Sequence, residues 1–252
     1  MIARSFIHLP KIGPASERRL WRRGVTDWQD FLAREDPVPG FSSMRWAELQ
    51  QELAGSVDAL TALDHAYFSR RLPPGEHWRT FERFRRRVAF LDIETTGLGN
   101  WADVTVVGVY DGVNMRTYVR GDNLDELEDD LARFALLVTY NGATFDLPFL
   151  RRRFPAAEWD HLHIDLRYPL HRLGYRGGLK GIERALGCER DPDIAHLDGF
   201  DAVRLWQEHC RGSDEALALL IRYNSADVEN LEPLAEQVYD ALSRAVVTAT
   251  DR

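Results

Sequence analysis

The sequence is poor in cysteine and lysine and contains no long apolar run. Its two cysteines, Cys188 and Cys210, are not closely spaced, so the sequence indicates neither a zinc knuckle nor a disulfide framework and fits a reducing compartment. No apolar stretch approaches the roughly 20 residues that a membrane-spanning helix needs, and the first residues lack the apolar segment of a signal peptide. We therefore expect a cytoplasmic protein with no membrane partner.

Basic residues are fewer than acidic ones, and the charges are unevenly distributed. The formal net charge is −8, which argues against simple electrostatic wrapping of nucleic acid. Residues 1–88 contain 15 basic and 11 acidic residues, whereas residues 89–252 contain 17 and 29. The acidic part can hold a metal site and the basic part can contact a polyanion. Thirty of the 32 basic residues are arginine, which suits bidentate phosphate contacts, although a biased genome composition gives the same excess.

The order of the expected elements predicts a helical N-terminal domain, residues 1–84, and an α/β domain, residues 85–252. Apolar residues recur at helical spacing up to a breaker at Pro73-Pro74-Gly75. Beyond it we expect strands over 88–98, 104–110, 115–120 and 136–140, with a helix over 124–134 before the last of them. Asp111-Gly112 is a hairpin signal, so the first three strands are expected to be antiparallel. This order predicts a mixed sheet flanked by helices.

Residues 12–14, Ile-Gly-Pro, predict a tight turn that opens a helix over 15–23. The segment resembles half of a helix-hairpin-helix motif, whose turn offers backbone N–H groups to a DNA phosphate. Lys11 stands where that motif usually has its first glycine. The alternative is a plain helical turn that packs Leu20, Trp21 and Trp28.

The strand expected over 88–98 carries two acids, Asp92 and Glu94, where apolar residues are expected. Strand side chains alternate, so both carboxylates lie on one face. Like charges this close to a core repel unless a proton or a cation offsets them, and a divalent metal does so best. For an isolated pair, a capping Asp92 and a solvated Glu94 are the more frequent arrangement. The following Thr-Thr-Gly turn can bring backbone close to a ligand.

Two later segments add acids at the ends of expected elements. Asp146 falls in the first turn of a helix after strand 136–140, where by itself it would be a helix-dipole acid. Tyr223 and Asp227 are neighbours on one face of a segment, 213–244, that is expected to be helical. Considered alone, they would be a packing tyrosine beside a solvated aspartate.

Two other charged clusters have less specific interpretations. His161, His163 and Asp165 alternate on one side of a segment, a spacing that can bind metal. A strand-edge or substrate-contact role is favoured, because the carboxylates described above suit an ion that prefers oxygen over imidazole. The arginines of residues 77–87 are typical of a solvated face, but a substrate-phosphate role stays open because they precede the acidic strand.

Taken together, the motifs resemble the DEDDy 3′-to-5′ exonucleases of the ribonuclease H-like superfamily, and look like its YprB-type branch. The resemblance covers about residues 87–242. It depends on Asp92-x-Glu94, Asp146 and Tyr223-x-x-x-Asp227 and on four phrases, Phe-Leu-Asp-Ile-Glu-Thr-Thr-Gly-Leu, Tyr-Asn-Gly-Ala-Thr-Phe-Asp-Leu-Pro-Phe, Gly-Leu-Lys-Gly-Ile-Glu and Tyr-Asn-Ser-Ala-Asp-Val-Glu-Asn-Leu. It implies a ribonuclease H-like mixed sheet, with three antiparallel strands followed by parallel strands, and cleavage of nucleic acid from a 3′ end.

The resemblance also implies a role for each acid, with Mg²⁺ or Mn²⁺ as two bound ions. Asp92 would bridge the ions, Glu94 and Asp227 would complete one site, and Asp146 would support the other. Two ions about 3.5–4 Å apart can stabilise both the attacking and the leaving oxygen of a phosphodiester. Tyr223 would orient the nucleophile, since a phenol with a pKa of about 10 is a poor base at neutral pH. Substrate contacts are expected from Thr95, Thr96, Gly97, Leu98, Asn141, Phe145, His163 and Lys180.

The sequence therefore predicts a metal-dependent 3′-to-5′ exonuclease, with single-stranded DNA rather than RNA as the first substrate to test. Two alternatives stay open. One is a structure-specific endonuclease or resolvase of the same fold with the same metals. The other is a nucleic-acid-binding module without activity.

Overall fold

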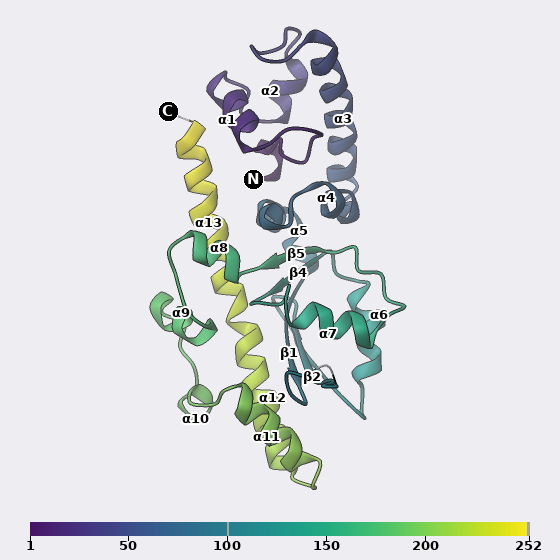
Figure 1. Ribbon diagram of the computed structural model, residues 1–252, viewed down its shortest axis with the longest axis vertical. Helices are drawn as coiled ribbons and strands as arrows, with labels where there is room; N and C mark the ends of the chain where they lie inside the picture. Colours follow the sequence, from purple (N-terminus) through teal and green to yellow (C-terminus); the bar gives the residue numbers. More distant parts are fainter. Residues whose placement is uncertain (100, 251–252) are drawn as a thin grey trace. The chain divides into compact units, whose positions relative to one another are not determined.

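The computed structural model describes residues 1–99 and 101–250 and contains two compact units (Figure 1). The helical unit comprises Met1–Arg85, Asp160–His163 and the residues from Tyr239 onward, and the α/β unit comprises Arg86–Trp159 and Ile164–Val238. The two predicted domains stay a prediction, and residues 100, 251 and 252 of the second lie outside the described residues. Every described helix is too short or too polar to cross a bilayer.

A mixed five-stranded sheet runs in the order β3-β2-β1-β4-β5. Its strands are β1 (Val88–Thr95), β2 (Val104–Tyr110), β3 (Met115–Val119), β4 (Leu136–Thr139) and β5 (Leu162–Asp165). Strands β1 and β2 pair antiparallel, as do β2 and β3, whereas β1 and β4 pair parallel. The predicted fold class, a mixed sheet that begins with three antiparallel strands and is flanked by helices, is confirmed.

Strand β1 lies in the middle of the sheet, which explains its nearly continuous apolar run. Ala89, Leu91 and Ile93 belong to an apolar cluster on one face of the sheet. Asp92 and Glu94 alternate with them and therefore lie on the opposite face.

Helices cover both faces of this sheet (Figure 1). The helices of the segment that follows β3 are α6 (Leu127–Leu131), α7 (Asp146–Arg153), α8 (Arg167–Arg172), α9 (Leu179–Leu186), α10 (Pro192–Ala195), α11 (Gly199–His209) and α12 (Asp214–Glu229), with the 3₁₀ turn η4 (Leu124–Glu126) before α6. Side chains of α6 and α7 pack with the cluster that contains Leu91. Side chains of α10, α11 and α12 pack around Val106 in a second cluster. The acids of β1 thus face the layer that contains α12.

The segment expected to be helical over 213–244 is divided in two. Helix α12 ends at Glu229, and α13 extends over Leu231–Thr250. Pro233 explains the interruption, because it has no N–H to donate to the carbonyl of Glu229 and its ring crowds that turn.

The helical unit is built around buried aromatic side chains. Its elements are η1 (Ile2–Arg4), α1 (Pro14–Arg22), α2 (Trp28–Ala33), α3 (Ser43–Thr61), α4 (His65–Arg71), η2 (Pro74–Thr80), α5 (Phe81–Phe84) and η3 (Arg85–Arg87), the last of which extends past Arg85. Phe31 stacks on Trp46 with ring centroids 3.9 Å apart. Buried Glu17 accepts a hydrogen bond from the backbone of Phe6 at 2.7 Å and forms an ion pair with Arg79 at 3.2 Å. This ion pair links α1 to η2.

The turn before α1 has the backbone conformation that glycine favours. Lys11 adopts a φ of 59°, in the left-handed region that costs an L-residue about 1–2 kcal/mol. We expect Lys11→Gly to leave the free energy of unfolding unchanged or to raise it by up to about 1 kcal/mol, since glycine removes this strain but adds chain entropy. Urea unfolding followed by circular dichroism measures this, with Lys11→Ala as the control that keeps the strain. A lower free energy of unfolding in Lys11→Gly but not in Lys11→Ala would contradict this expectation.

Candidate metal centre

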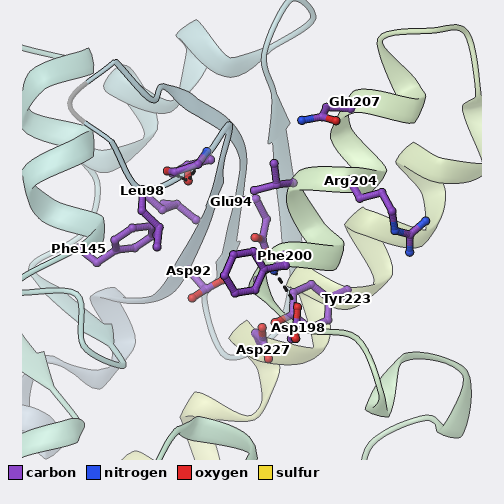
Figure 2. A pocket seen from close by; sticks show the side chains of 15 residues that line it. Asp92, Glu94, Leu98, Phe145, Asp198, Phe200, Arg204, Gln207, Tyr223 and Asp227 are labelled. Atoms are coloured by element: carbon purple, nitrogen blue, oxygen red, sulfur yellow. Dashed lines mark hydrogen bonds between the residues drawn. The ribbon is translucent and has the colours of Figure 1, made fainter.

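Three carboxylates from two elements converge beside the sheet. Asp92 and Glu94 project from β1, and Asp227 projects from the last turn of α12, one turn after Tyr223 in the same helix. One oxygen from each of the three acids lies within 4.8 Å of the other two. Figure 2 shows the side chains of these three acids. Glu94 and Asp227 are 8% and 6% exposed, and Asp92 is half-buried. Oxygen ligands at this separation suit a hard divalent cation.

Asp146 is the first residue of α7 and is also buried. The turn that leads into it is fixed by Asp165, whose carboxylate accepts backbone hydrogen bonds from Asn141 at 2.7 Å and Ala143 at 3.1 Å. Among the described residues, Asp146 Oδ1 is buried without a hydrogen-bond partner. An unpaired buried carboxylate oxygen beside other acids is a position where a cation or its water fits.

Burial raises the pKa of all four acids, although the guanidinium of Arg190 opposes this rise at Asp227. Burial raises the pKa of Asp92 well above its usual value, and the neighbouring Asp146 raises it further. Burial and then Asp227 do the same for the pKa of Glu94. Burial raises the pKa of Asp146 to about 7. The charged forms of these groups therefore need a compensating cation, and their oxygen-only donor set fits Mg²⁺ or Mn²⁺.

Asn224 is a site residue that the sequence analysis missed. Its Nδ2 donates to Asp92 Oδ2 at 3.0 Å and to the backbone oxygen of Asp92 at 3.2 Å. The approach needs Gly108, the β2 residue opposite Asp92, because a Cβ there would lie 2.3 Å from Asn224 Oδ1. The position of Asn224 directly after Tyr223 was the available signal, but its partner could not be inferred from the sequence.

Tyr223 is buried next to the acids, one helical turn before Asp227. Burial raises the pKa of its hydroxyl, and the charge of Asp227 adds to the effect. The phenol therefore stays protonated at neutral pH and can donate a hydrogen bond. Lys180 Nζ lies 4.9 Å from the centroid of the Tyr223 ring, which places this predicted substrate contact at the edge of the site.

Asp92, Glu94 and Asp227 line a pocket of about 780 Å³ whose walls are mostly apolar. Of the predicted substrate contacts, Thr95, Gly97, Leu98 and Phe145 line it. Figure 2 shows Leu98 and Phe145 on one side of the acids and Phe200 in front of them. Phe200, on α11, is 81% exposed and Leu98 is 79% exposed. Phe200 was not among the predicted residues, because nothing in the sequence of α11 links it to β1.

The other predicted substrate contacts have structural partners. Thr96 Oγ1 accepts a hydrogen bond from the backbone of Asp103 at 3.0 Å. The side-chain oxygen of Asn141 accepts from Thr144 Oγ1 at 3.0 Å. His163 belongs to the helical unit, where its backbone N–H donates to His77 Nδ1 at 3.0 Å. Their substrate roles stay predictions.

The sequence matches the model of the RNase H superfamily over residues 89–239. The chain belongs to the RNase H superfamily. The matched region covers more than half of the chain and includes all four acids and Tyr223. Family membership together with the acid cluster supports a nuclease that acts on nucleic acid with the help of divalent metal.

One solved structure with a similar fold is the family B DNA polymerase from the hyperthermophilic archaeon Pyrobaculum calidifontis. The similarity has a TM-score of 0.49 and 16% sequence identity, and it covers 60% of this chain. The aligned region spans 24% of the polymerase chain, about a quarter of its length. None of the curated proteins matches this chain.

The crowded acids make the metal-free protein sensitive to pH. The pKa of Asp146 is raised to about 7, so its protonated form stabilises the fold fully below pH 4 and this stabilisation is lost as the pH rises through 7. In EDTA, we expect the melting temperature to fall between pH 4 and pH 8. Asp146→Asn, which carries no proton to lose, should flatten this dependence. Differential scanning fluorimetry across this pH range measures the melting temperatures of the wild type and the variant. If the melting temperature of the variant fell equally steeply with pH, the raised pKa of Asp146 would not be the cause.

Proposed function

We propose that the protein is a metal-dependent 3′-to-5′ exonuclease of the DEDDy type, from the YprB-like branch, that acts on single-stranded DNA. The observation that carries the proposal is the convergence of Asp92, Glu94 and Asp227 within 4.8 Å, with Asp146 close enough to raise the pKa of Asp92. Phosphodiester cleavage needs charge stabilisation at two oxygens, and clustered carboxylates supply the ligands for it.

Each residue then has a chemical role. Asp92, Glu94 and Asp227 would hold one cation, and Asp92 and Asp146 would hold the second. Divalent ions bound there offset the charge that develops on the phosphate and on the attacking and leaving oxygens. Tyr223 keeps its proton, so its hydroxyl orients the attacking water rather than deprotonating it. Asn224 fixes the carboxylate of Asp92 through its amide at 3.0 Å.

The pocket supports a single-stranded end as substrate. Leu98 and Phe200 both line it and are 79% and 81% exposed, so the described residues leave most of their apolar surface uncovered. Unpaired bases stack on such side chains, whereas bases inside a duplex are already stacked on each other. Asp92, Glu94 and Asp227 line this pocket, and an unpaired strand end would reach them more readily than an intact duplex.

The helical unit is proposed to assist binding. Lys11 adopts a φ of 59° at the position where a helix-hairpin-helix motif usually has glycine, and α1 begins directly after the turn. Leu20, Trp21 and Trp28 are buried, so the helices after the turn also pack as a plain hairpin would. A phosphate contact at this turn is therefore part of the proposal and independent of the metal centre.

Replacement of Asp92 tests the activity. We expect Asp92→Ala to lower Mn²⁺-dependent cleavage by at least about 10³-fold while leaving folding intact or improved, because one of several repelling acids is removed. The assay uses an oligonucleotide labelled at its 5′ end, which an exonuclease of this polarity shortens one nucleotide at a time.

Asp129→Ala, on the exposed face of α6, is the matched control and should cleave like the wild type. Early internal fragments would instead identify a structure-specific endonuclease. Binding without cleavage by the wild type would identify an inactive binding module.

Phe200 provides a test of the stacking surface. We expect Phe200→Ala to raise the KM for single-stranded DNA by about 5- to 150-fold, since a base–aromatic stack contributes about 1–3 kcal/mol. The kcat should change less, because the acids are untouched. Val113→Ala, an exposed apolar residue in the β2–β3 turn, is the control. An unchanged KM in the Phe200 variant would exclude this surface from substrate binding.

A further inference from the structure

A buried guanidinium lies against one of the metal-centre acids. Arg190 follows α9, and its side chain is 6% exposed. Its Nη2 donates to Asp227 Oδ1. Nothing in the motifs discussed above includes Arg190, and the proposed cleavage chemistry does not use it.

Glu183 anchors this arginine from the other side. Arg190 donates to it through two nitrogens, Nε to Oε2 at 2.5 Å and Nη2 to Oε1 at 2.6 Å. The Glu183 carboxylate is almost fully buried and also accepts a hydrogen bond from Asn230 Nδ2 at 3.1 Å. A planar guanidinium held at two points has a fixed direction, so the atom that faces Asp227 is fixed as well.

The charges of this group are balanced without the metal-centre acids. Glu183 neutralises Arg190, so the contact with Asp227 orients that carboxylate without removing the net negative charge of Asp92, Glu94 and Asp227. A partner that orients a metal ligand typically changes metal affinity or activity by about 10- to 100-fold. An unpaired arginine at the same place would mainly repel an incoming cation.

We propose that Arg190 is a positioning residue, which Glu183 holds in place so that Asp227 stays directed at Asp92 and Glu94 and binds a divalent cation more tightly. This inference rests on the proposed metal centre and adds a chain of contacts, Asn230 to Glu183 to Arg190 to Asp227, that connects α9 and the end of α12 to the site.

The direction in which removal of Arg190 changes the affinity for a divalent cation separates positioning from simple charge repulsion. If Arg190 only repelled metal, its removal would tighten cation binding. If it positions Asp227, its removal loosens cation binding even though a positive charge has been taken away. The two outcomes cannot be confused, because they lie on opposite sides of the wild-type affinity.

The experiment measures Mn²⁺ binding to the full chain without substrate, from the electron paramagnetic resonance signal of free Mn²⁺. We expect Arg190→Met to raise the Kd by about 10-fold or more. Arg184→Met removes an exposed arginine from α9, the helix that precedes Arg190, and from the pocket that Arg190 also lines. It should leave the Kd within about 2-fold of the wild type. An unchanged or lowered Kd in Arg190→Met would overturn the proposal.

Two further measurements separate positioning from collapse of the fold. Saturating Mn²⁺ should return the cleavage rate of Arg190→Met to near that of the wild type, which loss of the folded state would not allow. If Arg190→Met does not fold, Arg190→Lys keeps the buried charge but cannot bridge two carboxylates in the same way, so its Kd should also rise. A wild-type Kd in that variant would overturn the proposal.

The wild type and Asp227→Asn test the metal centre itself. A wild type that binds no Mn²⁺ would end both the proposed function and this inference. A wild type that binds Mn²⁺ and loses it in Asp227→Asn, while Arg190→Met binds normally, would end this inference alone.

Discussion

Repulsion between buried carboxylates is the constraint on which the rest of the α/β unit depends. Asp92, Glu94 and Asp227 come from a central strand and from a helix packed on it, and burial opposes the charge of each one. Protons or cations must offset this charge, or the helix must be held against the sheet by other forces. The three acids are therefore held together by the packing of the helix on the sheet, which opposes the repulsion between their carboxylates.

Apolar packing supplies that resistance. Val106 of β2, Leu220 of α12 and Trp206 of α11 belong to one buried cluster on the face that carries the acids. A buried large apolar side chain contributes about 1.5–3 kcal/mol, so a cluster of this size outweighs the repulsion among a few carboxylates. Because the acids are attached to regular elements, their spacing follows from the packing of α12 on β1 and β2.

The sequence was sufficient for those features that follow from local periodicity. Alternation in β1 placed Asp92 and Glu94 on one face, and the apolar runs and the hairpin signal predicted the first four strands and the antiparallel pairing of the first three. Partners distant in the chain were not predictable. Arg190 meets Asp227 across 37 residues, and Asn224 meets Asp92 across 132, and both contacts exist only through tertiary packing. The break between α12 and α13 was missed because helical periodicity continues through it, although Pro233 interrupts the hydrogen bonds.

Gly108 shows how a residue without a functional group can limit the chemistry of a site. It has no side chain at the place where Asn224 and Val228 of α12 press on β2, and a Cβ would lie 2.3 Å and 2.8 Å from their nearest atoms. Any larger residue would have to push the helix outward, which would widen the gap between Asp227 and the two acids of the strand. The distance between Asp227 and the two acids of β1 thus depends on the missing side chain at Gly108. A larger residue at this position would disable the metal centre even though every metal ligand would still be present.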